Sequence, residues 1–326
     1  LSDQEVSSLH RIINEIKKIG VSVIYISHRI AEVKNISDRV TIMRDGSVVD
    51  TITVTQMEVK TVVNKMTGRD LTNKYPKLFI PKGREILKVE NVTSGNVIKD
   101  ISFTLRKGEI IGVAGLMGSG RSLLAKTIFG INRMDCGSIY IDRRKVKIRS
   151  PKDAIKSGIC YVPDDRLDKG LFSSFDIAAN ISVTNLEEFT RSFFLRKSMM
   201  VETAKRYVRQ LGIKVLDIEQ KAGYLSGGNQ QKVVLAKWFN SGARVFLLDE
   251  PTVGVDIASK VDIYNIVNEL LRNGAGIILI SSDISELLGM CDKLFVLFDG
   301  KIIKEIKRED ATEEAILYYA SGGRDS

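Results

Sequence analysis

The chain has 326 residues, 44% of them hydrophobic, and a formal net charge of +9, so it can bury one large core or two modest ones. No apolar run approaches the ~20 residues of a membrane span, the polar start does not predict a secretory signal, and two histidines exclude a histidine-rich site. Three scattered cysteines are typical of a reduced cytosolic protein, and the charge, which forms no dense basic block, suits polyphosphates or an anionic membrane surface at least as well as nucleic acid.

Residues 1 to about 67 predict the order helix, strand, helix, strand, turn, strand, helix. Residues 21–26 (VSVIYI) form an apolar run expected of a buried strand, and residues 39–43 form another. Asp45 and Gly46 mark a hairpin turn into a strand at 47–49.

The same order recurs near the C-terminus. Strands are expected at 278–281, 293–297 and 301–303, with a turn at Asp299 and Gly300. One constant shift carries position 28 onto position 282 and the first turn onto the second. Because matching strands with a matching turn are rarely accidental, we expect the tail of one domain at 1–67 and the whole of a second, similar domain at 86–326.

Residues 68–85 have the glycine, proline and charge content of a linker. The second domain opens with a strand at 86–89, which should pair with a strand at 101–105. A segment at about 171–224 lacks strand periodicity and is expected to be a helical insertion, notably at 201–211. Elsewhere strands and helices alternate, which predicts an α/β fold with a mostly parallel core sheet.

A glycine-rich stretch, residues 112–122 (GVAGLMGSGRS), follows residues 109–111 (EII), which open an apolar run, and precedes a helix at 123–129. Gly115, Gly118 and Gly120 allow the backbone to curl with its N–H groups inward, and the helix adds its positive end. This is the pattern of a P-loop, with Ser122 at the position of the Mg²⁺-binding hydroxyl and Arg121 where a lysine is expected. An ordinary glycine-rich strand-to-helix turn is the alternative.

An acidic pair, Asp249 and Glu250, follows the apolar run at 245–248. Ligands of open α/β sheets collect at the carboxyl ends of strands, so both acids should face the glycine-rich loop. Asp249 would hold Mg²⁺, directly or through water, and Glu250 would polarise the water that attacks a γ-phosphate. The alternative is a solvated acidic pair at a strand end.

Residues 225–232 (LSGGNQQK) place two glycines before a helix at 233–238, with the Ser226 hydroxyl beside free N–H groups. This arrangement can bind an anion at a helix start, although a plain capped helix explains it equally well. As a sequence, the stretch resembles the signature motif of ATP-binding cassette (ABC) proteins.

The second domain resembles an ABC cassette over its full length, with a Walker A loop at 115–122, a Walker B strand at 245–250 and a D-loop at 254–256. The signature stretch, Arg121 and residues 161–166 (YVPDDR) resemble the ATPase subunit of ribose/galactose-type monosaccharide importers, which carries two cassettes in one polypeptide. Residues 1–3 then resemble the D-loop of a first cassette, whose Walker A, signature and Walker B motifs we expect upstream of Leu1. His28 resembles the switch histidine of that first cassette.

The resemblance implies a P-loop ABC cassette with an antiparallel β subdomain, and ATP and Mg²⁺ as cofactors. Partners would be transmembrane permease subunits, a second cassette in cis or in trans and, indirectly, a sugar-binding protein, at the cytoplasmic face of the membrane and without nucleic acid. Glu250 and His28 would be catalytic, and Ser122 and Asp249 would hold the metal. The nucleotide would be bound by Gly115, Leu116, Met117, Gly118, Ser119, Gly120, Arg121 and Ser122, and the signature would comprise Leu225, Ser226, Gly227, Gly228, Asn229 and Gln230.

Two substitutions indicate a degenerate second site. Arg121 is bulkier and more forked than lysine, and Ser282 stands at the switch position, where an imidazole is usual. If that group contributes at the ordinary scale of acid–base catalysis, its loss costs about 10²–10⁴ in rate, so we expect slow hydrolysis. Asp164 occupies the place of the usual Q-loop glutamine.

Two other classes of function are weighed against this one. A non-transport ABC ATPase acting on nucleic acid or the ribosome would predict a coiled coil, zinc-binding cysteines or a basic arm, and the sequence has none of these. A non-hydrolysing regulatory module is favoured by Arg121 and Ser282 but opposed by the acidic pair. The sequence does not identify the transported sugar.

Overall fold

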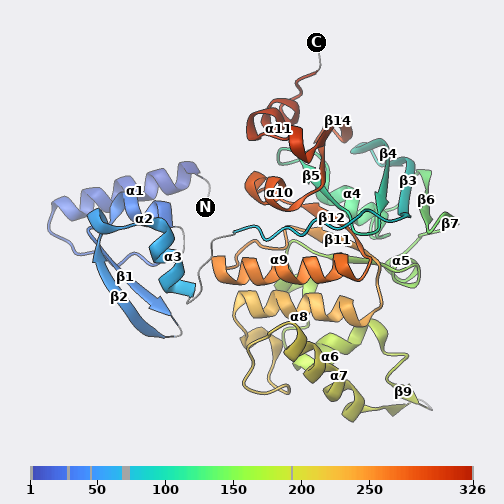
Figure 1. The fold of residues 1–326 in the computed structure, drawn as a ribbon, viewed down its shortest axis with the longest axis horizontal. Helices are drawn as coiled ribbons and strands as arrows, with labels where there is room; N and C mark the ends of the chain where they lie inside the picture. Colours follow the sequence, from blue (N-terminus) through green and yellow to red (C-terminus); the bar gives the residue numbers. More distant parts are fainter. Residues whose placement is uncertain (1–2, 28–29, 45, 68–73, 192–193, 325–326) are drawn as a thin grey trace. The chain divides into compact units, whose positions relative to one another are not determined.

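The computed structural model describes residues 3–27, 30–44, 46–67, 74–191 and 194–324 (Figure 1). It divides into two compact units, the first comprising Leu1–Lys74 with Asp256–Ala258 and the second Tyr75–Val255 with Ser259–Ser326. Among the described residues, none of the helices combines the length and the apolar character that a membrane crossing needs.

The first unit is a small α/β body built around one hairpin. Strands β1 and β2 pair antiparallel (Figure 1), and their apolar side packs on the neighbouring helices around a buried cluster of Ile30, Ile42, Met57 and Val62. The elements are α1 (Asp3–Lys18), α2 (Ile30–Ile36), β1 (Arg39–Arg44), β2 (Ser47–Thr53), the 3₁₀ turn η1 (Val54–Gln56) and α3 (Val59–Thr67).

The prediction of a strand at 21–26 is wrong. These residues belong to no helix or strand, and Ile24 and Ile26 are 91% and 93% exposed. An apolar run becomes a buried strand when neighbouring strands satisfy its backbone and helices cover both faces of the sheet. No described strand pairs with this segment. The other predicted elements of this part are present. Asp45, of the predicted turn, lies outside the described residues.

The second unit is organised around a six-stranded sheet in the order β14-β13-β5-β12-β11-β8. Its first five strands in chain order run parallel, and β14 is antiparallel to β13, which confirms the prediction of a mostly parallel sheet. The strands are β5 (Ile110–Ala114), β8 (Ile159–Val162), β11 (Val245–Asp249), β12 (Gly276–Ile280), β13 (Lys293–Phe298) and β14 (Lys301–Lys307). All five residues of β5, β11 and β12 are buried, as expected of central parallel strands.

A second, antiparallel sheet has the order β4-β3-β6-β7. Its strands are β3 (Glu85–Ser94), β4 (Ile98–Arg106), β6 (Cys136–Ile141) and β7 (Arg144–Val146). The expected pairing of 86–89 with 101–105 is present, for example between Leu87 and Leu105. The short strands β9 (Thr190–Arg191) and β10 (Phe194–Leu195) pair antiparallel.

Helices flank the sheets and form the insertion predicted after β8 (Figure 1). The insertion contains α6 (Ile177–Ser182) and α7 (Lys197–Gln210), together with the 3₁₀ turns η3 (Val183–Asn185) and η4 (Ala222–Tyr224). A π-helical turn, η2 (Arg166–Gly170), precedes it. The remaining elements are α4 (Arg121–Ile128), α5 (Pro151–Lys156), α8 (Gly227–Asn240), α9 (Ile257–Arg272), α10 (Ile284–Met290), η5 (Arg308–Asp310) and α11 (Glu313–Ala320).

The sequence repeat has a structural counterpart. The run α2, β1, β2, η1 has the same element order and the same element lengths as the run α10, β13, β14, η5. Both hairpins shift register at the equivalent point, between Ile42 and Met43 in β1 and between Val296 and Leu297 in β13. A β-bulge is a specific feature of a strand pair, so its recurrence indicates two copies of one structural unit.

Candidate functional site

The ends of three neighbouring strands meet at one edge of the parallel sheet. Strand β12 lies between β5 and β11, with Ile280 paired to Val113 on one side and to Asp249 on the other. The glycine-rich loop after β5, the serines after β12 and the acids at the end of β11 therefore lie side by side. This is the carboxyl edge at which open α/β sheets bind their ligands.

The glycine-rich loop needs its glycines. Gly118 and Gly120 have φ of +84° and +101°, a region that disfavours residues with a Cβ. At Gly115 an added Cβ would lie 2.5 Å from Oγ of Ser119. The chain then enters α4 at Arg121, directly after the cap residue Gly120, so the positive end of this helix closes the loop.

The glycine-rich loop, which we call the glycine cradle, also contains a polar atom that has no hydrogen-bond partner among the described residues. Oγ of Ser119 is buried and lacks a hydrogen-bond partner among the described residues. A buried hydroxyl of this kind costs free energy unless a ligand or water satisfies it. Together with the backbone of the glycine-rich loop and the N-terminus of α4, this hydroxyl can bind an anionic group such as a phosphate.

Ser122 and Asp249 are in direct contact. The Ser122 hydroxyl donates to Oδ1 of Asp249 at 2.9 Å, and the Tyr161 hydroxyl donates to Oδ2 at 2.8 Å. Burial raises the pKa of Asp249, and the two hydroxyls act against that rise. A hydroxyl and a carboxylate are hard oxygen ligands of the type that Mg²⁺ prefers, with phosphate oxygens completing the shell.

Tyr161 was not predicted as a site residue. The one sequence signal for it is its place in the stretch YVPDDR at 161–166. Its contact with Asp249 depends on the pairing of β8 with β11, which sets Tyr161 opposite Leu247. Burial and the nearby Asp249 charge hold its pKa well above the usual value, so the phenol remains a donor. Its ring packs on Phe129 with centroids 5.7 Å apart.

Glu250 stands beside this pair in a strained conformation. Its φ is +50°, a left-handed value uncommon for a residue other than glycine and associated with functional sites. Oε2 accepts a hydrogen bond from the Ser282 hydroxyl at 3.0 Å, and Oε1 lies 3.8 Å from Nη2 of Arg121. Burial raises the pKa of Glu250, against the lowering effect of Ser282 and Arg121.

The Arg121 guanidinium already has two partners within the protein. Its Nη1 donates to the Ser281 carbonyl at 2.7 Å, so the guanidinium bridges the end of β12 and the Glu250 carboxylate. Leu116 and Met117 of the loop are exposed, Met117 almost completely.

The signature stretch lies apart from these residues. Ser226 caps α8 with extended backbone angles, and its Oγ accepts from Nδ2 of Asn229 at 2.9 Å. Leu225, Gly228 and Gln230 are buried. No hydrogen bond or ion pair among the described residues joins this stretch directly to Ser122, Asp249 or Glu250.

Two further residues, His28 and Asp164, were predicted from the resemblance. His28 lies outside the described residues. Asp164, at the expected Q-loop position, is exposed and accepts a hydrogen bond from Nζ of Lys169 at 3.0 Å.

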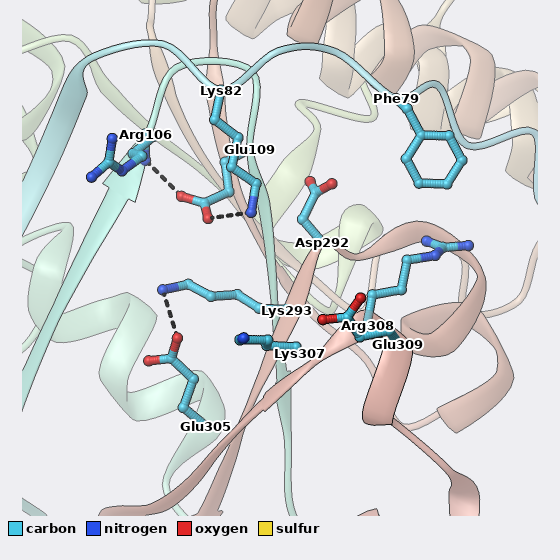
Figure 2. Close-up of a pocket in the computed structure, with 10 residues that line it drawn as sticks. All are labelled: Phe79, Lys82, Arg106, Glu109, Asp292, Lys293, Glu305, Lys307, Arg308 and Glu309. Carbon is cyan, nitrogen blue, oxygen red and sulfur yellow. Dashed lines mark hydrogen bonds and ion pairs between the residues drawn. The ribbon is translucent and has the colours of Figure 1, made fainter.

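A pocket of about 680 Å³ lies elsewhere in the second unit. Figure 2 shows that charged side chains line it and that several are already paired, including Lys82 with Glu109 and Lys293 with Glu305. Glu109 directly precedes β5 and Lys293 begins β13, so the pocket is at the amino ends of these strands. It is therefore at the opposite edge of the sheet from the glycine-rich loop.

A parallel sheet, a glycine cradle at a helix start, and a serine bonded to an aspartate at a neighbouring strand end define a P-loop nucleotide-binding domain. The family profile described as "ABC transporter" matches residues 98–253. The fold is similar to the crystal structure of a nucleotide-free ATP-binding cassette from an ABC transporter, with TM-score 0.62 and 25% identity over 72% of this chain and 95% of that one. A cassette crystallised in its ADP conformation is similar with TM-score 0.61 and 25% identity, over 73% and 96% of the two chains.

The sequence is also similar to curated relatives. It is 43% identical over 324 residues to the ribose import ATP-binding protein RbsA of Bacillus subtilis, covering 99% of this chain and 66% of the relative. It is 39% identical over 322 residues to a putative ribose/galactose/methyl galactoside import ATP-binding protein of Geobacillus kaustophilus, covering 99% and 64%. Residues 98–253 of the second unit therefore match the ABC transporter family, the unit has the fold of an ATP-binding cassette, and the expected fold class is confirmed. The chain spans just under two thirds of the length of these relatives.

Proposed function

We propose that this chain belongs to the energy-coupling subunit of a sugar importer, which binds and hydrolyses MgATP at the cytoplasmic face of the membrane. The observation that carries the proposal is the hydrogen bond between Ser122 and Asp249 with Glu250 alongside. Similarity to ribose and ribose/galactose import ATP-binding proteins supports sugar as the cargo class.

Each residue of the site has a distinct role in this proposal. The glycine cradle and the start of α4 bind the phosphates, and the Ser119 hydroxyl, which lacks a described partner, donates to one of them. Ser122 and Asp249 would hold Mg²⁺, which neutralises charge on the phosphates when bound. The Glu250 carboxylate accepts a proton from the attacking water, and the Ser282 hydroxyl at the end of β12 holds its Oε2.

Hydrolysis at this site is proposed to be slow. Ser282 contacts the Glu250 carboxylate with a neutral hydroxyl, so it cannot supply the charge or the second proton-transfer group of an imidazole. Arg121 is held by the Ser281 carbonyl. If the switch group contributes at the ordinary scale of acid–base catalysis, turnover is about 10²–10⁴ below that of a complete site.

The first unit is proposed to be the C-terminal part of a preceding cassette. The matching run of elements and the matching register shift in β1 and β13 support this. In such a tandem arrangement, in cis or in trans, His28 would serve the first cassette's site, and the signature stretch 225–230 would face the nucleotide bound by the first cassette.

An exposed aromatic cluster supports a permease partner. Phe172 and Phe175 stack with centroids 5.6 Å apart, and they are 49% and 53% exposed. Tyr224, 81% exposed, is close by, because the Gly223 N–H donates to the Ser173 carbonyl at 3.1 Å. Exposed apolar clusters of this kind mark contact surfaces, and we assign this one to a cytoplasmic segment of a transmembrane subunit.

The test separates the three classes of function. The purified chain is assayed for ATP hydrolysis, and tagged protein from cells is fractionated into membrane and ribonucleoprotein pools. The proposal predicts slow turnover and recovery with permease subunits, and a variant with Phe172→Ser and Phe175→Ser should keep turnover but leave the membrane pool. Recovery with RNA would favour the nucleic-acid class, and nucleotide binding without any turnover would favour a regulatory module.

A further inference from the structure

Arg166, in the turn that follows β8, connects three segments that are distant in sequence. Its Nε donates to Oε1 of Gln230 at 3.2 Å. Its Nη1 donates to the Val253 carbonyl at 2.8 Å, and its Nη2 donates to the Gly254 carbonyl at 3.3 Å. One guanidinium thus joins the first turn of α8 to the backbone of the loop that follows β11.

The surroundings of Arg166 are shaped to admit its guanidinium. A Cβ added at Gly227 would lie 2.6 Å from Nη2, and one added at Gly254 would lie 3.4 Å from Nη1. Gln230 is buried, and its amide Nε2 is held by the Gly223 carbonyl at 3.2 Å. The acceptor therefore has a fixed orientation, and a glycine of the signature stretch leaves the space that the arginine occupies.

The turn that carries Arg166 is itself fixed at both ends. The Asp165 carboxylate accepts from the backbone N–H groups of Leu167 and Asp168 at 3.0 and 3.1 Å. At the far end, Nζ of Lys237 donates to the Gly170 carbonyl at 2.6 Å. Because Gln230 and Lys237 both lie on α8, the turn is attached to that helix at two points.

We propose that Arg166 is a positioning residue that sets the start of the signature helix relative to the backbone at 253–254. The inference rests on the proposed function, in which the signature stretch 225–230 faces the nucleotide held by the opposing cassette, and in the assay of this chain alone that cassette is a second copy acting in trans. The planar fork of arginine spreads its donors over three nitrogens in fixed directions, toward a side-chain oxygen and two carbonyls, whereas all three donors of lysine are on one nitrogen of a flexible stem. Substrate-facing groups displaced by about 1 Å can cost about 10²-fold in rate.

The experiment compares Arg166→Lys with wild type in steady-state ATP hydrolysis by the full chain. We expect kcat to fall by between about 10- and 100-fold while KM for ATP changes less than about twofold, because the phosphate cradle of the same cassette is untouched. Arg196→Lys is the matched control, since Arg196 also donates to a backbone carbonyl, that of Glu188 at 2.6 Å, but within the helical insertion. It should leave kcat unchanged.

Two outcomes overturn the inference. Wild-type kcat in Arg166→Lys would show that the fork is unnecessary. A fall in kcat matched by an equal loss of folded protein, read from the thermal midpoint and from the emission of the sole tryptophan, Trp238, would make Arg166 a merely structural residue. The Glu250→Gln variant keeps the two hypotheses apart, because unchanged turnover in that variant would remove the proposed function whatever Arg166 does.

Discussion

The Ser282 hydroxyl donates a hydrogen bond to Oε2 of Glu250 at 3.0 Å. The contact is possible because β12 and β11 are neighbouring parallel strands whose carboxyl ends coincide. It links the acid that would activate water to the position at which the resemblance expects a histidine. A neutral hydroxyl stabilises the carboxylate by hydrogen bonding without adding a positive charge.

This contact predicts a change in the pH dependence of ATP hydrolysis. Burial raises the pKa of Glu250 and the Ser282 hydroxyl lowers it, and a general base acts in its ionised form. Ser282→Ala removes the lowering contribution of the hydroxyl and leaves those of the Ser282 backbone N–H and of Arg121, so the acidic limb of the kcat profile should move to higher pH. The measurement is kcat against pH for both proteins. Coincident acidic limbs, or a shift toward lower pH, would contradict the assignment of Glu250 as the base.

Tyr161 is expected to support Asp249. Tyr161→Phe deletes the donor to a buried carboxylate oxygen, and an unsatisfied buried acceptor costs about 1–3 kcal/mol. The free energy of unfolding in denaturant should fall by that amount, and the Mg²⁺ concentration for half-maximal ATP hydrolysis should rise. Tyr224→Phe, at an exposed position, is the control. Equal stability and Mg²⁺ dependence in both variants would show that the Tyr161 contact is unimportant.

The glycine-rich loop allows a paired stability test. Gly118 and Gly120 both have positive φ, so alanine at either should cost about 1–2 kcal/mol in free energy of unfolding. At Gly120 the added Cβ would also lie 3.1 Å from Cδ1 of Ile98, whereas at Gly118 it meets nothing within 4 Å. Denaturant unfolding should therefore find Gly120→Ala the less stable variant. The reverse order would be inconsistent with this loop geometry.

Lys237 predicts a pH dependence of stability. Burial lowers its pKa to about 8, below the ~10.4 of an unfolded chain. Between these values the unfolded state holds more protons, so the Lys237 contribution to the free energy of unfolding rises with pH. Lys237→Met keeps an unbranched side chain, one atom shorter, and removes the charge, so the free energy of unfolding of this variant should rise less between pH 8 and 10. Parallel curves for the two proteins would rule out this contribution.

Periodicity and turn residues predict much of the fold, because most strands of the second unit have neighbouring strands that pair with their backbone. The prediction at 21–26 failed because no described strand pairs with that segment. Its counterpart, β12, is a strand because β5 and β11 flank it, and local sequence does not record whether such neighbours are present. Propensity alone does not stabilise a strand that lacks pairing.

The parts of the candidate site that lie in contiguous sequence motifs could be predicted. The parts that depend on tertiary contacts could not. The loop, Ser122 and the acidic pair are contiguous patterns whose strand ends must converge in a parallel sheet. The contacts of Tyr161 and Arg166 depend on which strand lies beside β11 and on the path of the turn after β8. Neither is encoded by local spacing, so the roles of these side chains emerge from the tertiary structure.

The central claim is that a nucleotide in the glycine-rich loop faces Asp249 and Glu250. The most direct measurement is ATP binding and ATP turnover in Glu250→Gln, which keeps the shape of the side chain and removes its basicity. We predict that MgATP binding stays within about twofold of wild type while hydrolysis falls by about 10²–10⁴. Turnover equal to wild type in this variant would contradict the account.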